Sequence, residues 1–382
     1  MAVLAEIIYS MRYTIGKTNM KIKSAFLLTA SFMFWMMSSQ AMANQLANNA
    51  SPYLAMHGND PVDWHAWGPE ALKKAKDQDK MLFVSIGYFA CHWCHVMQRE
   101  SYADKEVARL LNKHFISIKV DRELNPVLDE RLIDFVQATA GRAGWPLNVF
   151  ITPDGYPVIG MTYVPRVNFT ELIEKLQDSW KKERATLTQA AIEVDDLLAV
   201  AREGENVALE LPLQEMQAAM VSMGMQFADK LQGGFGEQTK FPMAPQLSAM
   251  LEAYAQKPQQ ELGEFLQLTL DQMSQRGLYD HVGGGFFRYT TDPGWDTPHY
   301  EKMLYTSAML VPIFYRAADI FKRPEYVDIA TRSLHYMLNE MRGKDHAFIS
   351  SLSAIDDQGV EGGYYLWDKK TLKQHFNKEE ME

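Results

Sequence analysis

Two cysteines carry the most reactive chemistry in this sequence. Cys91 and Cys94 are the only cysteines among 382 residues, and they stand three apart in the stretch SIGYFACHWCHVM at residues 85–97. A Cys-x-x-Cys pair can be a redox dithiol, part of a metal site or, with a histidine after it, an attachment point for haem. The sequence around the pair has to decide among these three kinds of chemistry.

The residues before the pair favour a redox dithiol. Residues 81–86 form a short apolar run that predicts a buried strand, so a helix would begin at the pair directly after this strand. Backbone N–H groups and the helix dipole would stabilise a thiolate at Cys91, lower its pKa and make it the attacking nucleophile. We therefore expect an exposed Cys91 sulfur and a buried resolving thiol at Cys94. Protonated His92 and His95 would add positive charge.

Three alternatives compete with this interpretation. A structural disulfide would close so small a loop that it removes only about 2 kcal/mol of unfolded-state entropy, against about 4.7 kcal/mol for a loop of 100 residues. The string CHWCH at residues 91–95 fits covalent haem, although a strand directly upstream is unusual for such a site. Zinc could use Cys91, Cys94 and His95, but no second cysteine pair completes the site. We predict a thiol–disulfide oxidoreductase with no metal and no other cofactor.

The elements around the pair predict a thioredoxin-like α/β domain. Helical patterns and short apolar runs alternate, and a crossover between the first two strands makes them parallel, while a hairpin around residues 153–155 adds an antiparallel edge. Pro146 stands before the third strand, where such sites place a cis-proline opposite the dithiol, with an ordinary loop proline as the alternative. Helices are expected at residues 69–76, 102–115, 126–141 and 168–201, and strands at 81–86, 116–120 and on both sides of the turn at 153–155.

Beyond about residue 205 helical patterns dominate. Helices separated by glycine-rich loops predict an array of helical hairpins, whose loops usually carry the binding function. We expect an N-terminal extension and signal peptide over residues 1–43, a thioredoxin-like domain over 44–205 and an all-α domain over 206–382. The expected helices of the last domain cover residues 211–231, 245–255, 261–275, 302–321 and 326–341.

Charge and the N-terminal residues predict an exported, acidic protein. The net charge is −10, and the first 43 residues carry +3, which leaves −13 for the rest. So acidic a surface repels phosphate and anionic lipid, which argues against nucleic-acid or membrane partners. From Met20, the expected start of translation, two lysines precede an apolar run at residues 25–37, and Ala41-Met42-Ala43 fits cleavage after Ala43. The run spans about 20 Å, short of the ~30 Å bilayer core, so we expect a periplasmic or secreted protein rather than an anchored one.

Several stretches together resemble the spermatogenesis-associated protein 20 family. Residues 51–67, 85–97, 116–123 and 141–155 resemble its thioredoxin-like N-terminal domain. Residues 233–242, 278–305 and 353–367 resemble its second domain, an α/α toroid similar to those of sugar epimerases and six-hairpin glycosidases.

The resemblance implies roles for particular residues and a shape for the second domain. Cys91 and Cys94 match the family dithiol and Pro146 its proline. Family members continue well beyond residue 382, so we expect part of a toroid here. Its apolar helix faces would be covered by a homodimer, and the alternative is that the chain is a truncated product. Four residues match polar positions of the toroid's candidate cleft: His299, Glu301, Asp356 and Glu361.

The second domain also permits sugar chemistry on its own terms. Asp356 and Glu361 are carboxylates of the kind that acid–base work on sugars requires. The alternative function is therefore a sugar-binding or sugar-isomerising toroid with an accessory thioredoxin domain, and the plain structural alternative is that these polar residues tie loops to helix ends. The expected partners are proteins with thiols or disulfides, or a small carbohydrate. Four aromatic residues could stack on a sugar ring: Trp295, Tyr300, Tyr364 and Trp367.

Overall fold

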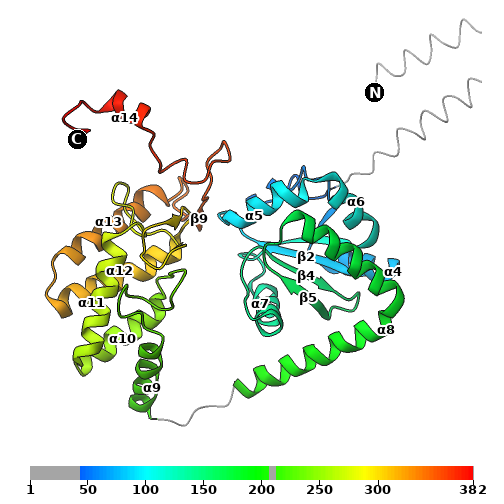
Figure 1. Cartoon of the computed structure of the whole chain (residues 1–382), viewed down its shortest axis with the longest axis horizontal. Helices are drawn as coiled ribbons and strands as arrows, with labels where there is room; N and C mark the ends of the chain where they lie inside the picture. The colour runs from blue at the N-terminus through cyan, green and yellow to red at the C-terminus, as the bar shows by residue number, and fades with distance from the viewer. Residues whose placement is uncertain (1–43, 206–211, 382) are drawn as a thin grey trace, which may run out of the picture.

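A five-stranded mixed sheet organises the first half of the chain in the computed structural model, which describes residues 44–205 and 212–381 (Figure 1). The strand order is β1-β3-β2-β4-β5. Strands β1 and β2 run parallel to β3, and β4 runs antiparallel to β2 and β5, as in thioredoxin-like domains. The strands are β1 (Trp64–Ala66), β2 (Leu82–Gly87), β3 (Ile116–Asp121), β4 (Leu147–Ile151) and β5 (Pro157–Met161).

Helices cover both faces of this sheet, and every residue of β2, β3 and β4 is buried as a result. Helices α4 and α7 pack on one face, and α5, α6 and the first part of α8 pack on the other. The helices are α3 (Pro52–Met56), α4 (Pro69–Gln78), α5 (His92–Met97), α6 (Lys105–His114), α7 (Pro126–Ala140) and α8 (Arg166–Glu205), with a π-helical turn η1 (Gln98–Tyr102) between α5 and α6.

The predicted elements of this half are present, but helix α3 and strand β1 were not predicted. Local signals explain the boundaries: Asp104 caps α6 by accepting the N–H groups of Glu106 and Val107, and Gly141 ends α7 with a positive φ of 75°. Strand β1 was not expected, because three residues within a stretch rich in proline and turn formers carry no periodic pattern. Its pairing with β3 supplies what the local sequence does not show.

A buried polar group lies beneath the sheet beside α3. The Asp60 carboxylate accepts hydrogen bonds from Trp64 Nε1 (3.0 Å) and Gln98 Nε2 (3.0 Å), and its Oδ2 lies 2.6 Å from His57 Nδ1. Burial and repulsion from Lys119 lower the pKa of His57 to about 3. The imidazole is therefore neutral at pH 7 and donates its Nδ1–H to Asp60.

The second half is predominantly helical, as expected, and all but the last of the helices that the structure describes there share one apolar core. Two pairs of very short strands, β6–β7 and β8–β9, tie its loops together, and Lys302, expected in a helix, lies in β8. The helices are α9 (Leu213–Gln226), α10 (Ala244–Gln256), α11 (Gln260–Gln275), α12 (Leu304–Phe321), α13 (Glu325–Glu340) and α14 (Lys369–His375). The strands are β6 (Tyr289–Thr290), β7 (Pro298–His299), β8 (Lys302–Met303) and β9 (Ser351–Leu352).

Two predictions, on the signal peptide and on the domain boundary, remain predictions. The expected signal over residues 1–43, with cleavage after Ala43, lies outside the described residues. The expected domain boundary at residues 205–206 falls at the edge of the undescribed segment 206–211. In the ranges 44–205 and 212–381, no helix is both long enough and apolar enough to cross a membrane.

Candidate functional site

The two cysteines stand where the sheet meets the second half. Strand β2 ends at Gly87, and Cys91 is the N-cap of α5, the helix that lies nearest β9 in Figure 1. The sulfurs of Cys91 and Cys94 form a disulfide, and Cys91 Sγ accepts the N–H of Cys94 at 3.2 Å. The strand–Cys-x-x-Cys–helix arrangement is therefore the one that the sequence predicted.

The expected exposure of Cys91 is wrong. Cys91 is only 2% exposed and Cys94 is fully buried. Cys91 opens instead onto a cavity of about 250 Å³ whose wall includes residues of the second half. The helical half thus covers the dithiol, which sequence reasoning on the first half alone could not show. From the first half the cavity is lined by Tyr88, His92, Trp93 and residues 143–145, and from the second by Phe241, Arg288, Tyr289 and Glu301.

Pro146 lies directly before β4, next to the end of β2 and the loop that leads to Cys91. The Trp145–Pro146 peptide bond is cis, and Leu147, the next residue, pairs with Ile86. The indole of Trp145 donates to Asp129 Oδ1 at 2.8 Å, and the Arg122 guanidinium lies 3.9 Å from its ring centre. These contacts hold the segment before Pro146 in place next to the dithiol.

The two histidines of the motif do not supply the positive charge that we expected. Burial lowers the pKa of His92 to about 4, with repulsion from His299 and Arg99 as lesser causes. Burial also lowers the pKa of His95, whose Nε2 lies 2.8 Å from the carbonyl oxygen of Phe89. Both imidazoles are therefore neutral near pH 7, so a thiolate at Cys91 would have to be stabilised by backbone N–H groups rather than by histidine charge.

A buried hydrogen-bonded group joins the two halves next to Cys91. The Tyr88 hydroxyl donates to Glu301 Oε2 at 2.7 Å, and Arg288 Nη1 lies 3.3 Å from the same oxygen and also donates to the Tyr88 oxygen. Burial raises the pKa of Glu301, while attraction to Arg288 opposes that shift. Neither Tyr88 nor Arg288 was singled out from the sequence, because Tyr88 lies 200 residues before Arg288 and 213 residues before Glu301.

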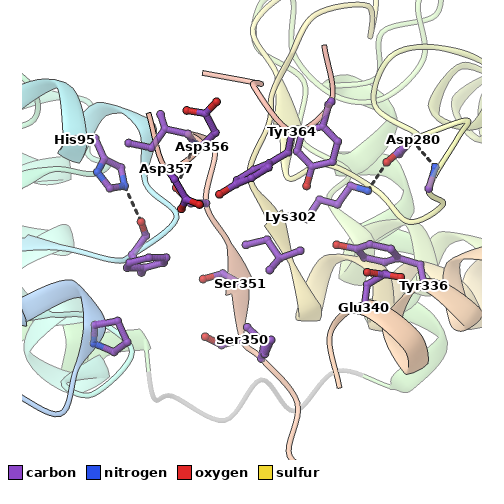
Figure 2. Close-up of a pocket in the computed structure, with 18 of the residues that line it drawn as sticks. His95, Asp280, Lys302, Tyr336, Glu340, Ser350, Ser351, Asp356, Asp357 and Tyr364 are labelled. Atoms are coloured by element: carbon purple, nitrogen blue, oxygen red, sulfur yellow. Dashed lines mark hydrogen bonds and ion pairs between the residues drawn. The ribbon is translucent and has the colours of Figure 1, made fainter. Parts of the chain in front are cut away.

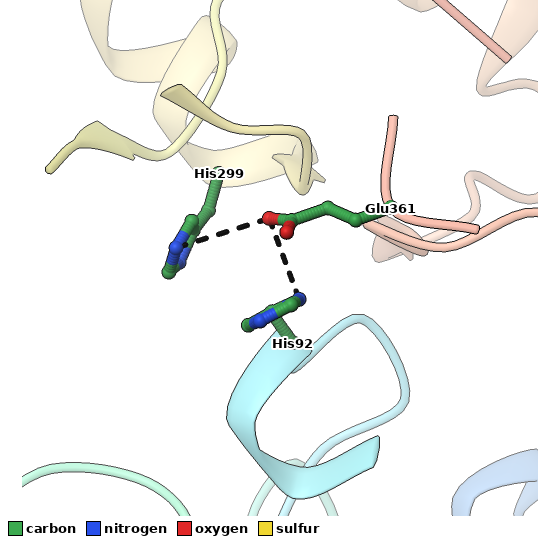
Figure 3. Close-up of side chains that lie close together, drawn as sticks. All are labelled: His92, His299 and Glu361. Carbon is green, nitrogen blue, oxygen red and sulfur yellow. Dashed lines mark ion pairs between the residues drawn. The ribbon is translucent and has the colours of Figure 1, made fainter. Parts of the chain in front are cut away.

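Of the four expected cleft residues, two converge, and they do so with a residue of the other half. Glu361 Oε1 lies 3.8 Å from His299 Nε2 and 3.4 Å from His92 Nδ1 (Figure 3). Glu301, two residues after His299, faces Tyr88 instead. The resemblance pointed to His299 and Glu361, whereas His92 was expected only to add positive charge beside the cysteines.

Asp356 lies apart from that cluster. Its Oδ1 accepts the N–H groups of Gln358 (2.9 Å) and Val360 (2.8 Å), and the side chain borders a larger cavity of about 940 Å³ (Figure 2). This cavity also lies between the halves, since His95 borders it from the first half. It is further lined by Asp280, Lys302, Tyr336, Glu340, Asp357, Tyr364 and Trp367.

The four aromatic residues expected to stack on a sugar differ in their exposure. Trp295 is fully buried and donates its Nε1 to the Gln232 carbonyl at 2.9 Å, so the expectation for this residue is wrong. Tyr300 stacks on Tyr365 rather than facing a cavity. Tyr364 and Trp367 are each 58% exposed and border the larger cavity, so they keep a surface on which a ligand could stack.

Comparison with known proteins found a family model that matches the first half and relatives that match most of the chain. A family model for DsbH-like thioredoxins, described as "Protein of unknown function, DUF255", matches residues 43–199. Spermatogenesis-associated protein 20 of Rattus norvegicus is 37% identical over 353 residues, which cover 88% of this chain and 45% of the relative. Over most of its length, this chain is therefore similar to spermatogenesis-associated protein 20.

Other relatives match at similar identity. The Homo sapiens protein of the same name is 36% identical over 355 residues, covering 88% of this chain and 45% of that protein. An uncharacterized protein of Caenorhabditis elegans is 35% identical over 348 residues, covering 87% of this chain and 47% of that protein. The chain thus spans about half the length of the curated relatives it matches.

Solved structures match only part of the chain, at low similarity. A cellobiose 2-epimerase from Spirochaeta thermophila is 17% identical and covers 37% of this chain and 39% of its own, with a TM-score of 0.33. A DsbH oxidoreductase is 20% identical and covers 31% of this chain and 85% of its own, with a TM-score of 0.25.

Proposed function

We propose that this protein catalyses thiol–disulfide exchange through Cys91 and Cys94. The observation that carries the proposal is the position of the pair. The pair follows the central strand β2 at the first turn of α5, and Cys91 borders a cavity that also touches Trp145, the residue before Pro146. Apart from this Cys-x-x-Cys pair the chain has no other cysteine, so one dithiol would have to do all of the chemistry.

The exchange proceeds in two steps. In the reduced protein, the Cys91 thiolate attacks one sulfur of a substrate disulfide, a Cys91–substrate bond forms, and the other substrate sulfur leaves as a thiolate that takes up a proton. Cys94 then loses its proton and attacks Cys91 Sγ, which releases the second substrate thiol and forms the disulfide of the present structure. Two electrons and two protons pass from the protein to the substrate, and the reverse sequence oxidises a substrate dithiol.

The covered position of Cys91 restricts the substrate. A cavity of about 250 Å³ is smaller than the ~300–1,000 Å³ of sites that hold drug-sized ligands, so it admits a group of side-chain size. A small disulfide would therefore react in the closed form, while a protein disulfide would need the helical half to move away. We also propose that the protein is exported and that a homodimer covers its helical half. Only the sequence supports these two points, and export rests on residues 20–43.

The test compares two disulfide substrates. Wild type is expected to reduce a small disulfide such as oxidised glutathione faster, relative to a thioredoxin control, than it reduces the disulfides of insulin. Cys91→Ser is expected to lose both activities to the uncatalysed background. A Cys91→Ser protein that keeps either activity would reject the proposal.

A second candidate is saccharide binding in the larger cavity. Exposed Tyr364 and Trp367 stand there with carboxylates of Glu340, Asp356 and Asp357, a combination that could stack on and hydrogen-bond to a sugar. Calorimetric titration with a panel of mono- and disaccharides tests it. Heat that Trp367→Ala removes would support this function, and no heat from any sugar would reject it.

A further inference from the structure

Three potential metal ligands meet at the junction of the two halves. His92 lies in the first turn of α5, His299 in β7, and Glu361 in the loop that follows β9 (Figure 3). One nitrogen or oxygen atom from each of the three side chains lies within 4.8 Å of the other two. None of these residues takes part in the exchange steps proposed for the two cysteines.

The cluster has unsatisfied polar atoms. Within the described ranges, His92 Nδ1 and Glu361 Oε1 are both buried and have no hydrogen-bond partner, although they face each other at 3.4 Å. A buried polar atom without a partner is unfavourable and calls for an explanation. Two facing acceptor atoms need a cation or a shared proton between them.

We propose that His92, His299 and Glu361 bind a divalent transition-metal ion such as Zn²⁺. Two imidazole nitrogens and one carboxylate oxygen are a ligand set that such ions use when a fourth position is left open for water or substrate. Bonds of about 2.0–2.2 Å put neighbouring ligand atoms about 3.4 Å apart in a tetrahedron, which is the separation between His92 and Glu361.

The surroundings of His299 suit this role. Its Nδ1 lies 2.5 Å from the Tyr289 hydroxyl, on the side of the ring away from Glu361. If Nδ1–H donates to Tyr289, the lone pair of Nε2 is free for the metal, as in many sites where a hydrogen bond orients the ligating histidine. Tyr289 in turn stacks on Phe241, which fixes its position.

The proposed ion would hold the halves together. His92 belongs to the first half, and His299 and Glu361 belong to the second, so a bound ion would fix the helical half over the disulfide. Tyr289 and His92 both border the cavity onto which Cys91 opens. Metal binding does not depend on thiol–disulfide exchange, so either proposal can fail without the other.

The test uses the full chain in its oxidised form, in which neither cysteine can bind metal. Metal-free protein is titrated with Zn²⁺ in competition with a chromophoric chelator, and circular dichroism checks that each variant folds. We expect one Zn²⁺ per chain, binding at least 10-fold weaker in Glu361→Gln and His299→Ala, and no change in His335→Ala, which alters an exposed histidine on α13. Zinc-edge X-ray absorption should show nitrogen and oxygen ligands and no sulfur.

Three outcomes would overturn the proposal. The first is no stoichiometric binding, which, together with an NMR signal from a protonated His92, would identify a proton between the two acceptor atoms. The second is binding that Glu361→Gln and His299→Ala leave unchanged, which would place the ion elsewhere. The third is sulfur in the absorption spectrum of the oxidised protein.

Discussion

The hydroxyl of Tyr88 donates a hydrogen bond of 2.7 Å to Oε2 of Glu301, although 213 residues separate them in the sequence. Tyr88 lies three residues before Cys91, and Glu301 lies two residues after His299. This contact therefore links the segment that carries the dithiol to the segment that carries His299. It also explains why Cys91 is covered, since both side chains line the cavity onto which its sulfur opens.

Removal of the Tyr88 hydroxyl should loosen this junction. Tyr88→Phe leaves the buried Glu301 carboxylate with one donor fewer, which costs about 1–3 kcal/mol of unfolding free energy. We also expect faster alkylation of reduced Cys91, measured by mass spectrometry. Tyr315→Phe, which removes a surface hydroxyl bonded to Thr331, is the matched control and should change stability by less than about 0.5 kcal/mol. Equal effects of the two substitutions would contradict the proposed role of Tyr88.

Gly87 should tolerate no side chain. A Cβ atom there would stand 2.3 Å from Tyr53 Oη and 2.7 Å from Cys94 Sγ, so Gly87→Ala must displace the disulfide or α3. Overpacking of this kind costs about 1–3 kcal/mol, measurable by urea denaturation. Gly68→Ala is the control, because nothing lies within 4 Å of the place that its new Cβ atom would take, and its φ of 171° suits any residue. A Gly87→Ala protein as stable as the control would show that the structure around Cys94 is wrong.

Acid should destabilise the protein through His57. The pKa of this buried imidazole is about 3, against about 6.5 in the unfolded chain. Between these values the unfolded state binds more protons, so the free energy of unfolding falls as the pH is lowered from about 6.5 towards 3. The loss from this one group should be about 2 kcal/mol between pH 7 and pH 5.

Substitution isolates that contribution. Urea denaturation of His57→Gln at pH 7 and pH 5 should show a smaller pH dependence than wild type, because glutamine does not titrate. His335→Gln, at an exposed position on α13, should keep the wild-type pH dependence. If His57→Gln keeps it as well, the pKa of His57 is the same in the folded and unfolded states, and the acid sensitivity has another origin.

The resolving cysteine should reveal the order of attack. Cys94→Ser retains the proposed nucleophile but cannot release the substrate, so mixed disulfides through Cys91 should accumulate, visible as added mass on non-reducing gels or by mass spectrometry. Cys91→Ser should form at least 10-fold fewer such adducts, because Cys94 is fully buried. The opposite ranking of the two variants would reverse the assigned roles.

Local sequence was enough to predict most of the fold. The apolar run before Cys91, the cap at Asp104 and the glycine after α7 each mark an element by a signal within a few residues, and each element is present. Strand β1 escaped because only its pairing with β3 defines it. The resemblance to a known family added the helical half, whose long helices are also visible as periodic patterns.

The candidate site was less predictable, because its residues meet across the two halves. Cys91, Cys94 and Pro146 could be named from one stretch of sequence and its neighbours. The burial of Cys91 and the meeting of His92 with Glu361 depend on packing between segments about 270 residues apart. Trp295 shows the same limit, since an aromatic residue in a polar loop looks exposed until Gln232 is placed next to it.

The most direct measurement is the intact mass of the protein after thiol alkylation across a graded glutathione redox buffer. The proposed exchange predicts two added alkyl groups that appear and disappear together over one reversible window of potential, whose midpoint distinguishes a reductant from an oxidant. Cys91→Ser should never take up two. A wild-type protein that takes up no alkyl group at any potential, or that carries the added mass of a haem, would contradict a redox dithiol at Cys91 and Cys94.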